Sequence, residues 1–177
     1  MPKQPPVGSS NAILDRLPAI FLWVGGFVFG RWAGLSFIIP FICSAAGYFA
    51  LKKVLRTERE TAIQLVAVQF GHWCWLCLGL TAPGGVAQVG GDVVILAVLL
   101  LWFGLTTKRA PAYCLLAFQV ISCAVNLSLV PAALGTPSLA AVSVHLVFRL
   151  AAIALIISFL VQDRRDSRNF EPEGDGA

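Results

Sequence analysis

Charged residues are scarce in this sequence: they make up 12% of its 177 residues, whereas hydrophobic residues make up 58%. Soluble proteins average about 45–50% apolar residues by a comparable set, so this composition excludes an ordinary water-soluble domain. Long polar loops are also missing, because the polar stretches between the apolar runs are short. We therefore predict an all-α integral membrane protein, since a bilayer admits helices whose apolar side chains face lipid.

The common catalytic signatures are absent as well. The sequence has no phosphate-binding glycine loop, no zinc-protease motif and no nucleophile elbow. The apolar runs also lack the paired carboxylates of a proton relay. The formal net charge is +4, but the basic residues lie mostly between apolar runs, where they signal membrane topology rather than a nucleic-acid surface. We expect a protein that is not an enzyme and does not bind nucleic acid.

The apolar runs predict six membrane-spanning helices. The first run, Leu17–Leu51, would form a helix of roughly 50 Å at about 1.5 Å per residue, which exceeds a hydrocarbon core of about 30 Å. We predict a break near Arg31, or five spans if the run is one tilted helix. The predicted helices are 13–30 (or 17–30), 32–51, 61–80, 93–106, 111–130 and 138–161.

These spans divide the chain into three parts. Residues 1–12 form a polar N-terminal tail, residues 13–161 the transmembrane helical bundle and residues 162–177 a disordered tail. With alternating spans, the lysines and arginines of the 52–59 link, the 108–109 link and the C-terminal tail fall on one side of the bilayer. Because cytoplasmic loops carry the excess of basic residues, we predict cytoplasmic termini, in a bacterial inner membrane.

A polar layer near the middle of the membrane is predicted around Arg149. This arginine lies inside the last apolar run, where a lipid-facing charge costs at least roughly 2.5–3.5 kcal/mol, so it should face other helices. At a rise of about 1.5 Å per residue, polar residues on the third, fifth and sixth spans fall within about one turn of its depth. The candidate residues are Gln69, His72, Gln119, Ser122, Asn126, His145 and Arg149.

The sequence leaves two roles open for this layer. Its polar groups either hydrogen-bond one another and hold the bundle together, or bind a polar or lipid-like ligand or a partner's transmembrane helix. Binding gains support because the nearest carboxylate, Asp92, is expected at the outer end of the fourth span, and a buried cation without a counter-ion is costly. A small transporter with Arg149 and His145 as substrate contacts is an alternative.

His72 and His145 also raise the question of haem, because one histidine from each of two helices is a known axial ligand set. The simpler prediction is that the two rings take part in hydrogen bonds between helices. The residues by themselves specify no cofactor.

Five cysteines lie inside apolar runs, where cysteine ordinarily packs as a small apolar side chain: Cys43, Cys74, Cys77, Cys114 and Cys123. Cys74 and Cys77 form a C-x-x-C motif toward the outer end of the third span. In this the chain resembles membrane thiol oxidoreductases that pass electrons from a disulfide to quinone, although that family has a second cysteine pair in an outer loop and both outer loops here lack cysteine. The resemblance implies a thiol or quinone oxidoreductase as the alternative function, with Cys74 and Cys77 as the redox pair.

Gly26, Gly30 and Gly34 recur at four-residue spacing in the first apolar run. Such a track of small residues lets two helices approach closely. We expect it to pack inside the bundle, and the alternative is a surface for a homo-oligomer or a membrane protein partner.

Overall fold

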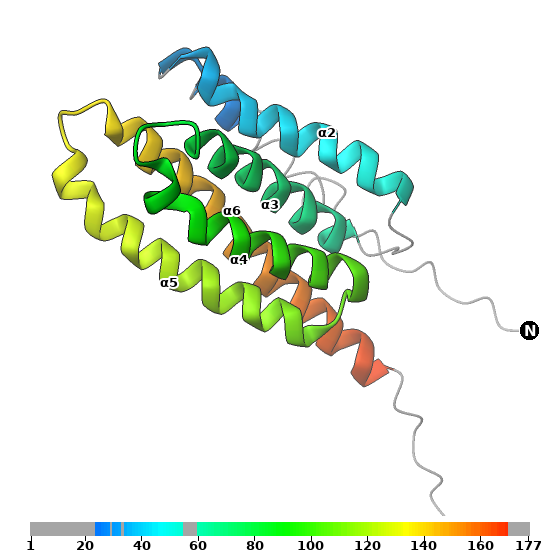
Figure 1. The fold of residues 1–177 in the computed structure, drawn as a ribbon. Coiled ribbons are helices and arrows are strands. Elements are labelled where there is room, and N and C mark those ends of the chain that lie inside the picture. The colour runs from blue at the N-terminus through cyan, green and yellow to red at the C-terminus, as the bar shows by residue number, and fades with distance from the viewer. Residues whose placement is uncertain (1–23, 29, 33, 55–59, 170–177) are drawn as a thin grey trace, which may run out of the picture.

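The computed structural model describes residues 24–28, 30–32, 34–54 and 60–169, and the regular structure of these residues is entirely helical (Figure 1). A short 3-10 helix, η1 (Leu35–Ile38), leads into α2 (Ile39–Val54). It is followed by α3 (Glu60–Gly79), α4 (Gly85–Thr106), α5 (Arg109–Ala133) and α6 (Ser138–Asn169). Residues 24–28 and 30–32 are helical as well. The prediction of an all-α chain is confirmed.

Helices α2 to α6 are each long and apolar enough to span a membrane. The central helix is α3, which packs against α2, α4 and α6. In its most apolar window 61% of the residues are buried, against 11% for α4 and 17% for α5. The last two helices instead expose leucine, isoleucine and valine side chains at their surfaces. A bilayer accommodates such an apolar exterior, so the expected multi-pass architecture is confirmed.

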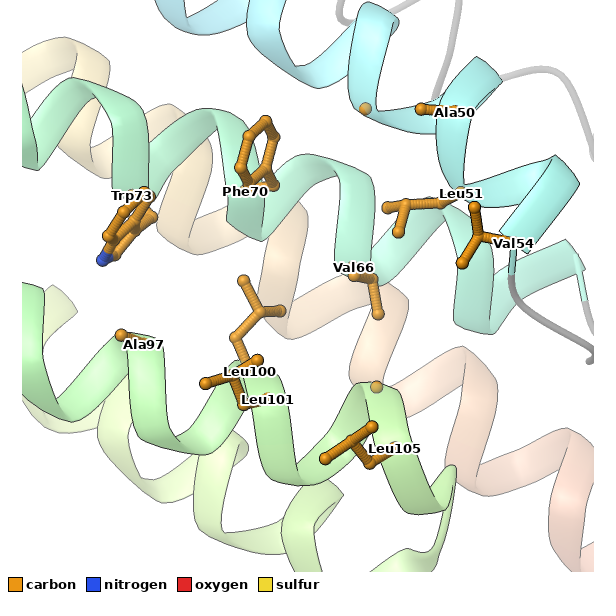
Figure 2. Close-up of a pocket in the computed structure, with 12 residues that line it drawn as sticks. Ala50, Leu51, Val54, Val66, Phe70, Trp73, Ala97, Leu100, Leu101 and Leu105 are labelled. Carbon is orange, nitrogen blue, oxygen red and sulfur yellow. The ribbon is translucent and has the colours of Figure 1, made fainter.

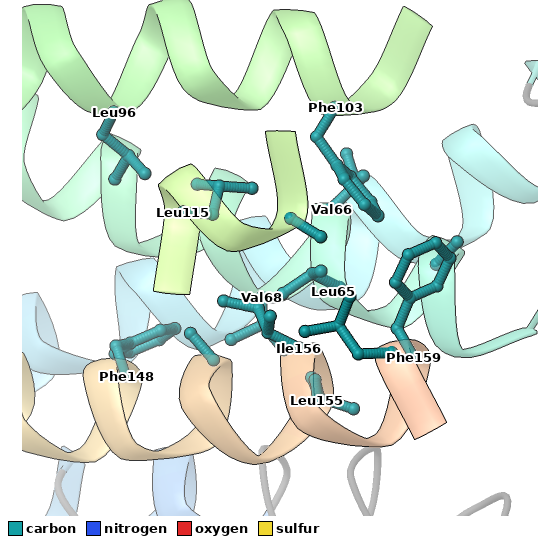
Figure 3. Packing of buried hydrophobic residues seen from close by; sticks show 14 of the residues in the cluster. Leu65, Val66, Val68, Leu96, Phe103, Leu115, Phe148, Leu155, Ile156 and Phe159 are labelled. Atoms are coloured by element: carbon teal, nitrogen blue, oxygen red, sulfur yellow. The ribbon is translucent and has the colours of Figure 1, made fainter. Parts of the chain in front are cut away.

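Aromatic and aliphatic side chains from α3, α4, α5 and α6 fill the core (Figure 3). Phe148 of α6 lies toward one end of it (Figure 3), with its ring centroid 4.9 Å from that of Phe41 on α2. Toward the other end, the rings of Phe103 and Phe159 meet edge to face at 5.1 Å. Lipid tails are as apolar as these side chains, so close packing of this kind, rather than escape from water, favours helix association.

The chain breaks between the first apolar segment and α2 at Gly34, three residues after the predicted position. Gly34 has φ 109° and ψ 167°, a conformation that glycine adopts without steric cost. The predicted break is confirmed, but Arg31 and Trp32 still belong to the preceding helical turn. The rest of the predicted first helix falls on residues 13–23, which lie outside the described residues, so a sixth span stays a prediction.

The fourth helix begins at Gly85 rather than at the predicted Val93. Gly84 precedes it with φ 74°, and Gly85 packs on the end of α3, where an added Cβ would lie 2.0 Å from the carbonyl oxygen of Gly79. Each glycine weakens a helix in water by about 1 kcal/mol, but an unpaired backbone group in lipid costs several kcal/mol. The helix therefore continues through the second glycine pair, and the predicted 81–91 link contracts to a tight turn.

The helix ends that carry basic residues meet at one end of the bundle, where α2, α4 and α6 finish and α3 and α5 begin (Figure 1). Arg109 forms an ion pair with Asp163 there, and Arg164 donates a hydrogen bond of 2.9 Å to the Tyr113 hydroxyl. These contacts hold α6 as a helix to Asn169, beyond the predicted end of its span. We call this end the basic end; its cations are Lys52, Lys53, Lys108, Arg109, Arg164 and Arg165.

Candidate functional site

Arg149 lies in a hydrogen-bonded network that joins four helices. From α6, its Nη2 donates to Oδ2 of Asp92 on α4 at 2.5 Å, and its Nη1 donates to Oε1 of Gln119 on α5 at 3.2 Å. The amide of Gln119 extends the network, because its Nε2 donates to Oε1 of Gln69 on α3 at 3.0 Å. The predicted similarity in depth of Arg149, Gln119 and Gln69 therefore corresponds to direct contact. We call these four residues the Arg149 network.

Asp92 is the counter-ion of Arg149, so the expectation that no carboxylate lies at the depth of the arginine is wrong. The reason is the early start of α4: Asp92 is the eighth residue of the helix, about 10 Å along its axis at 1.5 Å per residue. The guanidinium also lies over the ring of Phe118, with 5.6 Å between Cζ and the ring centroid. The sequence signal for this pairing was the single charge in the run 85–106, which is as long as a span.

The two charged residues of the Arg149 network differ in exposure, because the arginine is buried and the aspartate reaches the surface. The Arg149 side chain is 2% exposed, whereas that of Asp92 is 33% exposed. Among the described residues, Arg149 is the hydrogen-bond donor that the structure gives to Asp92, which leaves further lone pairs of this carboxylate unused. The ion pair therefore reaches the surface of the bundle through Asp92.

His72 and His145 form a second polar contact between α3 and α6. Nε2 of His72 lies 3.1 Å from Nδ1 of His145, and the His72 ring stacks on Phe148 with centroids 5.6 Å apart. His72 is completely buried, and its Nδ1 has no hydrogen-bond partner among the described residues. The predicted hydrogen bond between the helices is confirmed.

Ser122 and Asn126 share α5 with Gln119 but do not join its network among the described residues. Both are half-buried, and Nδ2 of Asn126 is buried there without a hydrogen-bond partner. The three residues lie on one face of α5 by their spacing, but Asn126 is about 10 Å along the helix axis from Gln119. A common face therefore does not bring them into one network. Of the predicted polar layer, Gln69, Gln119 and Arg149 belong to the network. The two histidines form a separate contact with each other. Ser122 and Asn126 bond to neither group among the described residues.

All five cysteines are free thiols. Cys74 and Cys77 lie in the last two turns of α3 and are half-buried. Activated thiols typically lie at a helix N-terminus or beside a basic group, and this pair lies at the opposite end of its helix. The C-x-x-C motif therefore lacks the helix N-terminal position that commonly activates such thiols.

Two glycines of the predicted track, Gly26 and Gly30, pack against side chains of the same chain. A Cβ on Gly26 would lie 2.8 Å from Cβ of Phe41, and one on Gly30 would lie 2.1 Å from Cγ1 of Ile38. Gly34 meets no atom within 4 Å and provides the backbone break instead. The first two glycines thus pack within the bundle, and an oligomer through the track stays a prediction.

Gly71 is a close-packing residue that the sequence analysis did not identify. A Cβ at this position of α3 would lie 1.8 Å from Oγ of Ser44 and 2.3 Å from the carbonyl oxygen of Pro40. Ser44 itself donates a hydrogen bond of 2.9 Å to that carbonyl. Gly71 therefore sets the distance between α2 and α3, and a single glycine without a repeated spacing gave no signal for it.

No family model, curated protein or solved structure matches this chain. In the described part of the chain, no three histidine, cysteine, aspartate or glutamate side chains are grouped to hold a metal ion. What the Arg149 network offers is a buried guanidinium, two amides and one partly exposed carboxylate, a set suited to hydrogen bonding and ion pairing.

Proposed function

We propose that this protein is a non-enzymatic membrane protein that binds a polar ligand or a partner's transmembrane helix at the Asp92–Arg149 pair. The observation that supports this most directly is the partial exposure of Asp92 within a membrane-spanning helix. Intramembrane charges ordinarily face the protein interior or a water-filled cavity and mark functional sites. A carboxylate at the bundle surface fits a protein whose site is completed by a second polar group.

The chemistry of that second group follows from the network. Arg149 already neutralises Asp92, so the bound group need not be a cation. It should be a hydrogen-bond donor that reaches the free lone pairs of the carboxylate, such as a hydroxyl, an amide or an ammonium group. A helix–helix hydrogen bond of this kind contributes about 0.6–2 kcal/mol, which is enough to orient a ligand or a partner helix against apolar surroundings.

The other functions have less support. A thiol oxidoreductase would use Cys74 and Cys77. These cysteines lie near the C-terminal end of α3, whereas it is the N-terminal end of a helix that lowers the pKa of a thiol. A transporter would need Arg149 and His145 to meet solvent from alternate sides, and the side chain of Arg149 is nearly fully buried.

We further propose that the protein resides in a bacterial inner membrane with its basic end in the cytoplasm. The support is the gathering at that end of lysines and arginines from two links and from the last turns of α6, because basic residues are retained on the cytoplasmic side during insertion. Asp92 then lies in the half of the membrane toward the outer face, since α4 begins at the opposite end.

Native mass spectrometry of the full-length protein in mild detergent tests the binding site. We expect wild type to carry a bound small molecule, lipid or partner chain that is lost in Asp92→Asn. The control is Asp163→Asn, which alters the other arginine–aspartate pair at the basic end and should leave the bound species in place. The double variant Asp92→Leu/Arg149→Leu also lacks the site but leaves no buried charge alone.

The measured masses distinguish a binding site from a network that only holds the helices together. Loss of the bound species from both Asp92 variants, with retention in Asp163→Asn, supports the proposal, and the lost mass gives the chemical class. The same bare mass for all forms, or the same bound species on all forms, would show that the network only holds the helices together.

A further inference from the structure

An apolar groove lies between α2 and α4, with α3 as its floor (Figure 2). Its volume is about 550 Å³, within the range of roughly 300–1,000 Å³ typical of ligand pockets. Ala50 and Val54 lie along one wall, Phe70 and Trp73 on the floor, and Gly104 and Leu105 along the other wall. The groove is separate from the Arg149 network, none of whose residues line it.

The exposed lining of the groove is wholly apolar, and a hydrogen bond joins its α3 floor to its α4 wall. Its exposed lining contains no polar atoms, so it suits a hydrocarbon chain. At the end of the groove away from the basic end, the Trp73 indole Nε1 donates a hydrogen bond of 3.1 Å to the carbonyl oxygen of Val93 on α4. The Phe70 and Trp73 rings stack there with their centroids 6.3 Å apart. A preformed groove loses little conformational freedom when it is filled, which favours binding.

Two lysines lie in the chain next to the residues that line one end of the groove. Figure 2 shows Val54 and Leu105 at the same end, where α2 and α4 finish, with Trp73 at the other. Lys53 precedes Val54, and Lys108 caps α5 three residues after Leu105. Both lysines are exposed and neither forms an ion pair within residues 34–54 and 60–169. Lysine side chains extend along apolar surface and place their ammonium groups at the membrane boundary.

An apolar groove that ends where two helix ends carry exposed lysines matches one kind of molecule. We propose that the α2–α3–α4 groove binds an anionic phospholipid, with an acyl chain along Phe70 and Trp73 and the headgroup phosphate between Lys53 and Lys108. A neutral phospholipid offers the same chain but gains less at the lysines. A second protein helix would fill the walls without needing the charges at their end, which is why the lipid is the occupant that the charge distribution favours.

The filling of the groove is tested with Gly104→Phe. Gly104 lines the groove, and an added Cβ there meets no atom within 4 Å, so a phenylalanine at this position should occupy space in the groove. Gly91→Phe is the matched control, because Gly91 is on the same helix, is likewise unobstructed and does not line the groove. The full-length, delipidated protein is titrated with phosphatidylglycerol and, separately, with phosphatidylcholine of identical acyl chains, and bound lipid is counted by native mass spectrometry.

We expect wild type and Gly91→Phe to bind phosphatidylglycerol more tightly than phosphatidylcholine, and Gly104→Phe to lose the tight phosphatidylglycerol site. Removing both ammonium groups in Lys53→Gln/Lys108→Gln should abolish the preference between the two lipids while acyl-chain binding persists. Each lysine near an anionic surface contributes about 1 kcal/mol, or on the order of fivefold in affinity. Arg165→Gln, which removes a basic-end charge on α6, is the charge control and should keep the preference.

Three results would overturn the proposal. They are equal affinity of wild type for the two lipids, undiminished phosphatidylglycerol binding by Gly104→Phe, and a preference that survives the double lysine substitution. A dimer that Gly104→Phe disrupts while lipid binding is unchanged would assign the groove to a second copy of the chain instead. Because Asp92 and Arg149 are untouched in every variant, failure here leaves the proposed function to its own experiment.

Discussion

Arg149 and Asp92, which are 57 positions apart in the chain, form an ion pair of 2.5 Å between α6 and α4 in which the cation is buried and the anion is partly exposed. The arginine alone would be an uncompensated charge in a low-dielectric interior, and the aspartate alone would be a bare carboxylate beside lipid. Each therefore makes the other tolerable. The pair also links α4 with α6, each of which packs against the central α3.

Breaking this pair from one side should destabilise the protein more than removing it entirely. Asp92→Leu leaves the buried guanidinium without a counter-ion, and we expect a loss below the about 3–5 kcal/mol of a fully buried pair, because Asp92 is one-third exposed. Asp92→Leu/Arg149→Leu should recover part of that loss. Thermal unfolding in detergent, followed by tryptophan fluorescence, measures both. A double variant that is less stable than Asp92→Leu would show that the lone guanidinium carries no such penalty, and would contradict this prediction.

Gly71→Ala should force α2 and α3 apart. The added methyl group would lie 2.3 Å from the backbone carbonyl oxygen of Pro40, which cannot move without the helix, so we expect a loss of about 1–3 kcal/mol, the usual cost of overpacking. Adding Ser44→Ala removes the nearer side-chain atom and should restore only part of the stability. Gly91→Ala, which meets nothing within 4 Å, is the control and should be neutral or slightly stabilising in the same unfolding assay. Equal melting temperatures for the two glycine-to-alanine variants would contradict the close contact inferred for Gly71.

The five thiols should react as free cysteines. Maleimide labelling of the unfolded protein, with mass detection, is expected to add five labels whether or not a reductant is present, because the structure has no disulfide among these cysteines. A gain of two labels on reduction, absent from Cys74→Ser/Cys77→Ser, would reveal a disulfide between that pair. Such a result would favour the oxidoreductase alternative over the proposed binding function.

The two ends of the bundle should be accessible from opposite sides of the membrane. In a cysteine-free background, Arg165→Cys at the basic end should react with an impermeant thiol reagent only from the cytoplasmic side, since basic residues mark that side. Ala82→Cys, in the exposed turn between α3 and α4, should react only from the outer side. The reverse pattern would place the basic end outside and invert the orientation of Asp92 in the membrane.

Part of this structure was predictable because membrane spans follow from length and composition. Apolar runs of about 20 residues predicted the helices, and their rise per residue placed Arg149, Gln119 and Gln69 at one depth, where they bond to each other. Basic residues in two links and in the C-terminal segment predicted that the helix ends beside them would gather on one side. These properties depend on distance along the helix axis, which the sequence determines directly.

What only the tertiary structure decided is the rotation of each helix and the identity of its neighbours. A span that is apolar all around has no polar face to indicate which side is buried, so the contacts of Asp92 with Arg149 and of Gly71 with Ser44 depended on packing. The start of α4 was decided in the same way, because its glycines predict a turn in water, whereas in lipid the backbone must satisfy its own hydrogen bonds. The sequence determined the depth of each residue in the membrane. Close packing between helices determined the direction in which each side chain points around its helix axis.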